Sequence, residues 1–150
     1  MHEKAAKPMQ FLKIYCLILF FIPSFYILCL EVGARIAGKT LFAYADASPL
    51  IAAILISGAC DFLLSVISWL DWNRLTKTRD NYVRFMQLQV ASQLLTGNLL
   101  CLVLAILGLR QGKDVAGQGK VPSQAVAIAY FCLAMAIICG GFYLSFLLRG

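Results

Sequence analysis

The chain has 150 residues, of which 61% are hydrophobic and only 13% are charged, and its formal net charge is +6 at pH 7. A soluble domain is roughly half apolar and about 25% charged, so these side chains could not cover a surface in water. The composition therefore indicates an integral membrane protein. It excludes a soluble enzyme and a nucleic-acid-binding module.

Four stretches are long and apolar enough to cross a bilayer, which takes about 20 residues. They cover residues 11–32, 49–70, 83–109 and 124–148. Because lipid offers no partner to unpaired backbone groups, each stretch is expected to be a helix. The connections are too short to hold another domain. The sequence thus predicts an all-α integral membrane protein with one four-span domain over residues 1–150, folded as a four-helix transmembrane bundle.

The distribution of Lys and Arg predicts the orientation of this bundle. One side carries eight of them: Lys4, Lys7, Lys13, Arg74, Lys77, Arg79, Arg84 and Arg149. The other side carries five: Arg35, Lys39, Arg110, Lys113 and Lys120. Since cytoplasmic ends collect basic residues, both termini are expected on the cytoplasmic side. The loop residues Arg74, Lys77, Arg79 and Arg84 are also candidate contacts to anionic lipid headgroups.

The second and third predicted spans carry polar residues that lipid should not contain. An ionised Asp in the middle of a span costs about 2.5–3.5 kcal/mol to insert, which makes Asp61 the most informative residue of the sequence. Serines at helical spacing extend its face of the second span, and glutamines form a similar face on the third. The candidate intramembrane polar layer comprises Asp61, Gln93, Gln89, Ser57 and Ser65.

The depth of this layer follows from counting residues inward from the same cytoplasmic side. Asp61 and Gln93 each lie eight residues from an interfacial aromatic residue, which places both about 12 Å deep. Pro23 leaves the Leu19 carbonyl without its helical donor at a similar depth. We therefore expect a contact between Asp61, Gln93 and this carbonyl.

Two interpretations of Asp61 remain open at this point. In the structural one, Asp61 is protonated and donates a hydrogen bond that fixes which helix faces which. In the functional one, Asp61 binds and releases a proton or a cation, as intramembrane acids often do.

The fourth predicted span carries small residues on one face, which lets helices approach closely in lipid. This candidate helix-packing face comprises Ala129, Cys132, Ala136 and Gly140. It could pack the fourth helix within the bundle or receive a helix from another subunit.

The sequence offers no enzyme chemistry. All six cysteines lie inside predicted spans, without a CxxC pair, and the single histidine is His2, so neither a disulfide framework nor a metal site is expected. No cofactor-binding motif is present. We expect a non-catalytic subunit that lies among membrane lipids and packs against larger membrane partners in a hetero-oligomeric complex. The alternative is a small oligomeric proton-coupled transporter or channel that uses Asp61. Neither interpretation includes a nucleic acid, and no soluble small-molecule substrate is evident.

Overall fold

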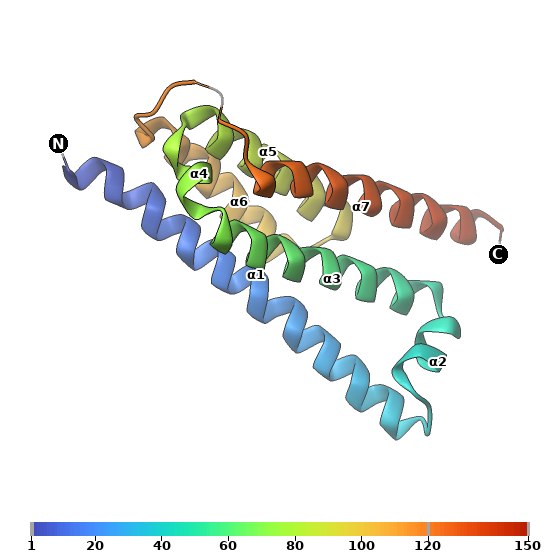
Figure 1. Ribbon diagram of the computed structural model, residues 1–150. Coiled ribbons are helices and arrows are strands. Elements are labelled where there is room, and N and C mark those ends of the chain that lie inside the picture. Colours follow the sequence, from blue (N-terminus) through green and yellow to red (C-terminus); the bar gives the residue numbers. More distant parts are fainter. Residues whose placement is uncertain (1, 120, 150) are drawn as a thin grey trace.

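The structure is a computed structural model that describes residues 2–119 and 121–149, where all regular secondary structure is helical (Figure 1). The helices are α1 (His2–Ile36), α2 (Leu41–Asp46), α3 (Pro49–Leu70), α4 (Trp72–Lys77), α5 (Arg79–Thr96), α6 (Leu99–Gln111), the 3-10 helix η1 (Gly112–Asp114) and α7 (Gln124–Arg149).

Three helices in the described part of the chain are long and apolar enough to cross a membrane. They are Gln10–Ile36 within α1, Pro49–Leu70, which is α3, and Gln124–Phe142 within α7. These helices correspond to the first, second and fourth predicted spans. The protein is therefore an all-helical chain with three candidate membrane-spanning helices.

The third predicted span is wrong, because the segment from Val83 to Leu109 is not one helix. It is divided between α5 and α6, which are separated by Gly97 and Asn98. Gly97 adopts a left-handed conformation with φ of 72°, and its N–H donates to the Gln93 carbonyl. Glycine takes this conformation without steric cost and ends helices in this way. The Asn98 side chain then accepts the Cys101 N–H at 3.3 Å and begins α6.

The two helices fold back on each other as a hairpin (Figure 1). A Cβ atom on Gly108 would lie 2.8 Å from the Met86 sulfur, and one on Gly112 would lie 2.7 Å from a Val83 methyl carbon. The end of α6 therefore lies against the start of α5. Because of this reversal, the hairpin enters and leaves the molecule at the same end.

Helix α5 packs against α6 and α7. Its buried residues share one face of the helix, and they are Tyr82, Phe85, Met86, Leu88, Gln89, Ser92 and Gln93. The opposite face is exposed and includes Asp80, Arg84 and Gln87. The polar side chains of the buried face, Gln89, Ser92 and Gln93, are therefore enclosed by the neighbouring helices.

The candidate spanning helices α1 and α3 are antiparallel, as are α3 and α7. Ser65 of α3 donates to the Cys16 carbonyl of α1 at 2.7 Å, whereas Gly58 lies near Pro23. Asp71, directly after α3, accepts the N–H of Ala125 at the start of α7 at 3.1 Å. The N-terminus of α1 and the C-terminus of α7 consequently lie at opposite ends of the molecule (Figure 1).

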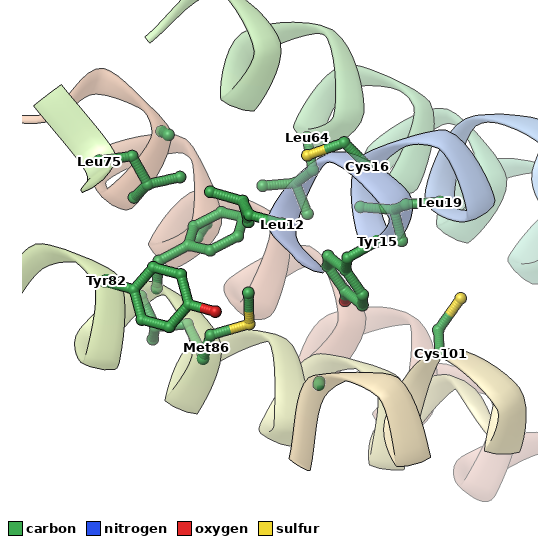
Figure 2. Close-up of a cluster of buried hydrophobic side chains, with 14 of the residues drawn as sticks. Leu12, Tyr15, Cys16, Leu19, Leu64, Leu75, Tyr82, Met86 and Cys101 are labelled. Atoms are coloured by element: carbon green, nitrogen blue, oxygen red, sulfur yellow. The ribbon is translucent and has the colours of Figure 1, made fainter. Parts of the chain in front are cut away.

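The two ends differ in packing. We call the end that holds α4, η1 and the start of α5 the closed end, and the end that holds α2 the open end. The fully buried residues Leu12, Tyr15, Leu75, Tyr82 and Met86 gather toward the closed end (Figure 2). At the open end only α1, α3 and α7 continue beyond the hairpin, with α2 joining α1 to α3.

Candidate functional site

Asp61 and Gln93 meet in the interior, as their equal predicted depth suggested. The Gln93 Nε2 amide donates to Asp61 Oδ1 at 2.7 Å, and the two residues are 0% and 5% exposed, respectively. Asp61 thus accepts this hydrogen bond, whereas the structural one of the two interpretations from the sequence had it donate. The Leu19 side chain is buried, but no hydrogen bond joins Asp61 to the Leu19 carbonyl among the described residues.

Gln89 connects α5 to α1 one turn closer to the closed end. The Tyr15 hydroxyl donates to Gln89 Oε1 at 2.9 Å, and both side chains are fully buried. Helix α5 therefore contacts α1 through Gln89 and α3 through Gln93. Interhelical hydrogen bonds of this kind contribute about 0.6–2 kcal/mol each and fix the rotation of a helix in its bundle.

Several buried polar atoms near these pairs have no hydrogen-bond partner among the described residues. They are Gln93 Oε1, Gln89 Nε2, Ser68 Oγ, Tyr82 Oη and Gln111 Oε1. The residues of α3 and α5 among them follow the helices from the level of Asp61 toward the closed end. The interior between Asp61 and the closed end therefore contains several polar groups among apolar side chains.

Besides its contact with Gln93, Asp61 lines a cavity of about 470 Å³. The hairpin turn at Gly97 and Asn98 forms part of this cavity, together with segments of α1, α3 and α7. Ser57 and Thr96 add hydroxyl groups near the carboxylate, whereas most other lining residues are apolar. A second, much smaller space of about 10 Å³ touches Asp61 between α3, α5 and α7, which is close to the size of one water molecule.

The electrostatics of the cavity are dominated by Asp61. It is the one carboxylate in the lining, and no Lys, Arg or His of the described residues lines the cavity. The C-terminal end of α5 and the N-terminal end of α6 meet at the turn, so their opposite helix dipoles largely offset each other. The cavity is therefore an environment that favours a positive charge.

The predicted serines of α3 differ in burial. Ser65 is buried and its hydroxyl donates to the Cys16 carbonyl, which makes it a contact between α1 and α3. Ser57 is half-buried and lines the cavity. The structure thus separates Ser65 from the cavity and keeps Ser57 beside Asp61.

The predicted small-residue face of α7 divides into two parts. Ala129 and Cys132 are buried against the bundle, and the Cys132 thiol lies 3.7 Å from the Cys60 carbonyl. Ala136 is half-buried and Gly140 is exposed, with no atom within 4 Å of a Cβ built on Gly140. The first part packs inside the molecule, whereas the second part lines the Asp61 cavity and is not covered by another helix.

The basic residues Arg74, Lys77, Arg79 and Arg84 are all exposed at the closed end. Their neighbour Asp71, which the sequence-based analysis did not single out, is 7% exposed. Its Oδ2 accepts the Ser123 hydroxyl at 2.7 Å and the Ala125 N–H, and so caps α7. An Asp between two predicted helices is a common helix cap, but the sequence does not show that Asp71 caps α7, because the N–H that it accepts lies 54 residues away.

The described residues contain no group of three or more His, Cys, Asp or Glu side chains that could hold a metal ion. Comparisons of the chain with protein-family models, with curated proteins and with solved structures found no match.

Proposed function

We propose that this protein is a small, multi-pass membrane transporter or channel, active as an oligomer, in which Asp61 binds the transported proton or cation. The observation that carries this proposal is the buried Asp61 carboxylate at a cavity that lacks any basic residue among those described. A buried carboxylate without a basic partner favours a proton or a cation as its ligand.

The polar side chains between Asp61 and the closed end support the same function because they fix the position of the carboxylate. Gln93 donates to Asp61 Oδ1 at 2.7 Å, and one turn further along α5 the Tyr15 hydroxyl donates to Gln89 Oε1 at 2.9 Å. In the proposed function these bonds hold α5 against α3 and α1, while the cavity gives the proton or cation access to Asp61.

We infer that the closed end faces the cytoplasm. Nine basic residues belong to it: Lys4, Lys7, Lys13, Arg74, Lys77, Arg79, Arg84, Arg110 and Lys113. Three belong to the open end: Arg35, Lys39 and Arg149. Lys120 lies outside the described residues.

The ratio of nine basic residues to three is larger than the ratio of eight to five in the four-span interpretation. The difference arises mainly because the hairpin returns the end of α6, with Arg110 and Lys113, to the closed end. The bias of basic residues toward the cytoplasm therefore favours three crossings. With three crossings the N-terminus is cytoplasmic and the C-terminus lies on the opposite side of the membrane.

Proton flux into liposomes tests the transport function. The purified protein is reconstituted, a pH gradient is applied, and a dye inside the vesicles reports the flux. We expect Asp61→Asn to abolish flux, because the amide cannot take up and release a proton near pH 7. Asp80→Asn is the matched control, since Asp80 is exposed at the start of α5. Equal flux in wild type and Asp61→Asn would contradict the proposal.

A second candidate function, the non-catalytic subunit, is favoured by α7. Its face is occupied at Ala129 and Cys132 but open at Gly140 and Gly141, where nothing lies within 4 Å of a built Cβ. Glycine on an open face lets another helix approach closely in lipid. In this function the occupant is a transmembrane helix of a larger membrane partner.

Extraction of the native protein in mild detergent, followed by mass measurement of the particle, tests the second function. Another polypeptide at a fixed ratio is expected, and Gly140→Leu should release it. Ala134→Leu is the matched control, because Ala134 is exposed on a different side of α7. A particle that contains only this chain would contradict the subunit function and leave the transport proposal in place.

A further inference from the structure

We propose, building on the transport function above, that the Asp61 cavity binds an amphiphilic organic monocation, namely a protonated amine with a compact apolar body. The ammonium group pairs with the Asp61 carboxylate, and the apolar body contacts the walls formed by α1 and α3.

The size and the walls of the cavity favour an organic ligand over a bare ion. Its volume of about 470 Å³ falls in the usual range of small-molecule sites, roughly 300–1,000 Å³. The walls away from Asp61 are apolar and include Ile22, Pro23, Tyr26, Leu50, Ile54 and Leu94. A dehydrated metal ion would occupy a small fraction of this space and would leave these walls without contacts. An apolar body fills the space and takes its surface out of water.

The charge of the ligand follows from the hydrogen bonding of the Asp61 carboxylate, which lines the cavity. Asp61 Oδ1 accepts the Gln93 amide, and no other donor among the described residues bonds to this carboxylate. The second oxygen is therefore available to a ligand in the cavity. An anion would be repelled there, and a neutral solute would leave the carboxylate without a charge partner. A cation forms a charge-assisted hydrogen bond, the strongest kind available to this group.

The exposed lining residues indicate how such a ligand reaches the cavity. Tyr26, Leu94 and Leu95 line it, and their side chains are 54%, 65% and 50% exposed. Tyr26 belongs to α1, one of the three candidate membrane-spanning helices, so we place the opening of the cavity within the bilayer. Amphiphilic amines partition into bilayers and would therefore be concentrated at this opening.

A binding measurement with two matched ligands tests the proposal. The probe is radiolabelled 1-adamantylamine, which is cationic at pH 7, and the competitor is 1-adamantanol, which has the same shape but no charge. The protein is held in nanodiscs of neutral lipid, and binding is measured against empty nanodiscs. We expect saturable binding to the wild type and at least tenfold weaker binding to Asp61→Asn. The alcohol should compete at least tenfold more weakly than unlabelled amine.

A second pair of variants keeps the test decisive if Asp61→Asn does not fold. Ala53 lines the cavity, whereas Ala59 lies on the same helix, is exposed, and does not line it. Ala53→Phe should weaken binding at least tenfold because the ring takes up part of the space for the apolar body, and Ala59→Phe should bind as the wild type does. Equal binding to these two variants would overturn the proposal, as would equal competition by the alcohol.

The outcomes for the ligand and for the transport function are separable. Asp61-dependent proton flux without saturable amine binding would overturn the ligand assignment and keep the transport function. Amine binding that depends on Asp61, with neither proton flux nor uptake of the labelled amine into liposomes, would keep the ligand assignment and contradict transport.

Discussion

The closed end and the open end of the molecule differ in how tightly their helices pack. At the closed end, large side chains such as Tyr15, Tyr82 and Phe85 are completely buried among α1, α5, α6 and α7. At the open end, large side chains of α1 such as Phe25 are 64% exposed, and Gly140 of α7 has open space beside it. Lipid surrounds apolar side chains as favourably as protein does, so their exposure alone costs little. What separates the two ends is polar pairing and close backbone contact, both of which concentrate toward the closed end.

The largest effect is expected from a methyl group at the closed end. A Cβ on Gly117 would overlap the Lys77 carbonyl oxygen, and the Gly117 carbonyl accepts the Arg79 N–H at 2.8 Å. The loop would have to move, so Gly117→Ala should lower the free energy of unfolding by about 3 kcal/mol. Thermal unfolding in detergent, read as the loss of helical circular dichroism, measures this change.

Gly140→Ala is the matched substitution at the open end. Its methyl group meets no atom within 4 Å, and alanine favours a helix interior over glycine by about 0.5–1 kcal/mol. We expect Gly140→Ala to melt at the wild-type temperature or slightly above. Equal destabilisation by the two substitutions would remove the distinction between the ends.

A smaller effect is expected where a polar pair is broken. Tyr15→Phe removes the donor to Gln89 Oε1, and Gln89 Nε2 already lacks a partner among the described residues. Because the amide is buried, the loss should be about 1–2 kcal/mol in the same unfolding measurement. Tyr26→Phe is the control, since the Tyr26 side chain is 54% exposed. If Tyr26→Phe lowers the free energy of unfolding as much as Tyr15→Phe does, the buried hydrogen bond contributes no more to stability than an exposed tyrosine hydroxyl.

The smallest effect is expected from an exposed ion pair at the open end. Arg35 Nε lies 2.8 Å from Glu31 Oε1, and the two side chains are 78% and 35% exposed. Helix-surface pairs at this spacing contribute at most about 0.5 kcal/mol, and salt screens them. Glu31→Gln should therefore leave the unfolding temperature nearly unchanged, and 0.5 M NaCl should cancel any difference. A larger loss would mean that the open end is held together by charge.

The contact between Asp61 and Gln93 was predictable from sequence for a simple physical reason. Both depths were counted from the closed end, and α3 and α5 do begin or end there, so the estimate depended only on the rise per residue of a helix. The direction of the hydrogen bond was not predictable, because Asp and Gln can each donate or accept.

The hairpin was missed because hydropathy does not distinguish one crossing from two shorter helices. Residues 83–109 exceed the length that a single span requires, and Gly97 followed by Asn98 combines a helix-ending residue with a helix-starting one. Those two signals together could have indicated the turn. The cavity could not have been predicted, since it depends on how α1, α3 and α7 are placed beyond that turn.

The sidedness of the segment after α6 tests the hairpin, and with it the distinction between the ends, most directly. Single cysteines are introduced at Gln118, at Asn73 and at Lys39, all of them exposed, and labelled with a membrane-impermeant maleimide in intact cells and in inverted vesicles. The parent chain reports any labelling of native cysteines. The hairpin predicts that Gln118→Cys reacts from the same side as Asn73→Cys and opposite to Lys39→Cys. Labelling of Gln118→Cys from the side of Lys39→Cys would show that residues 83–109 cross the membrane and would contradict the account.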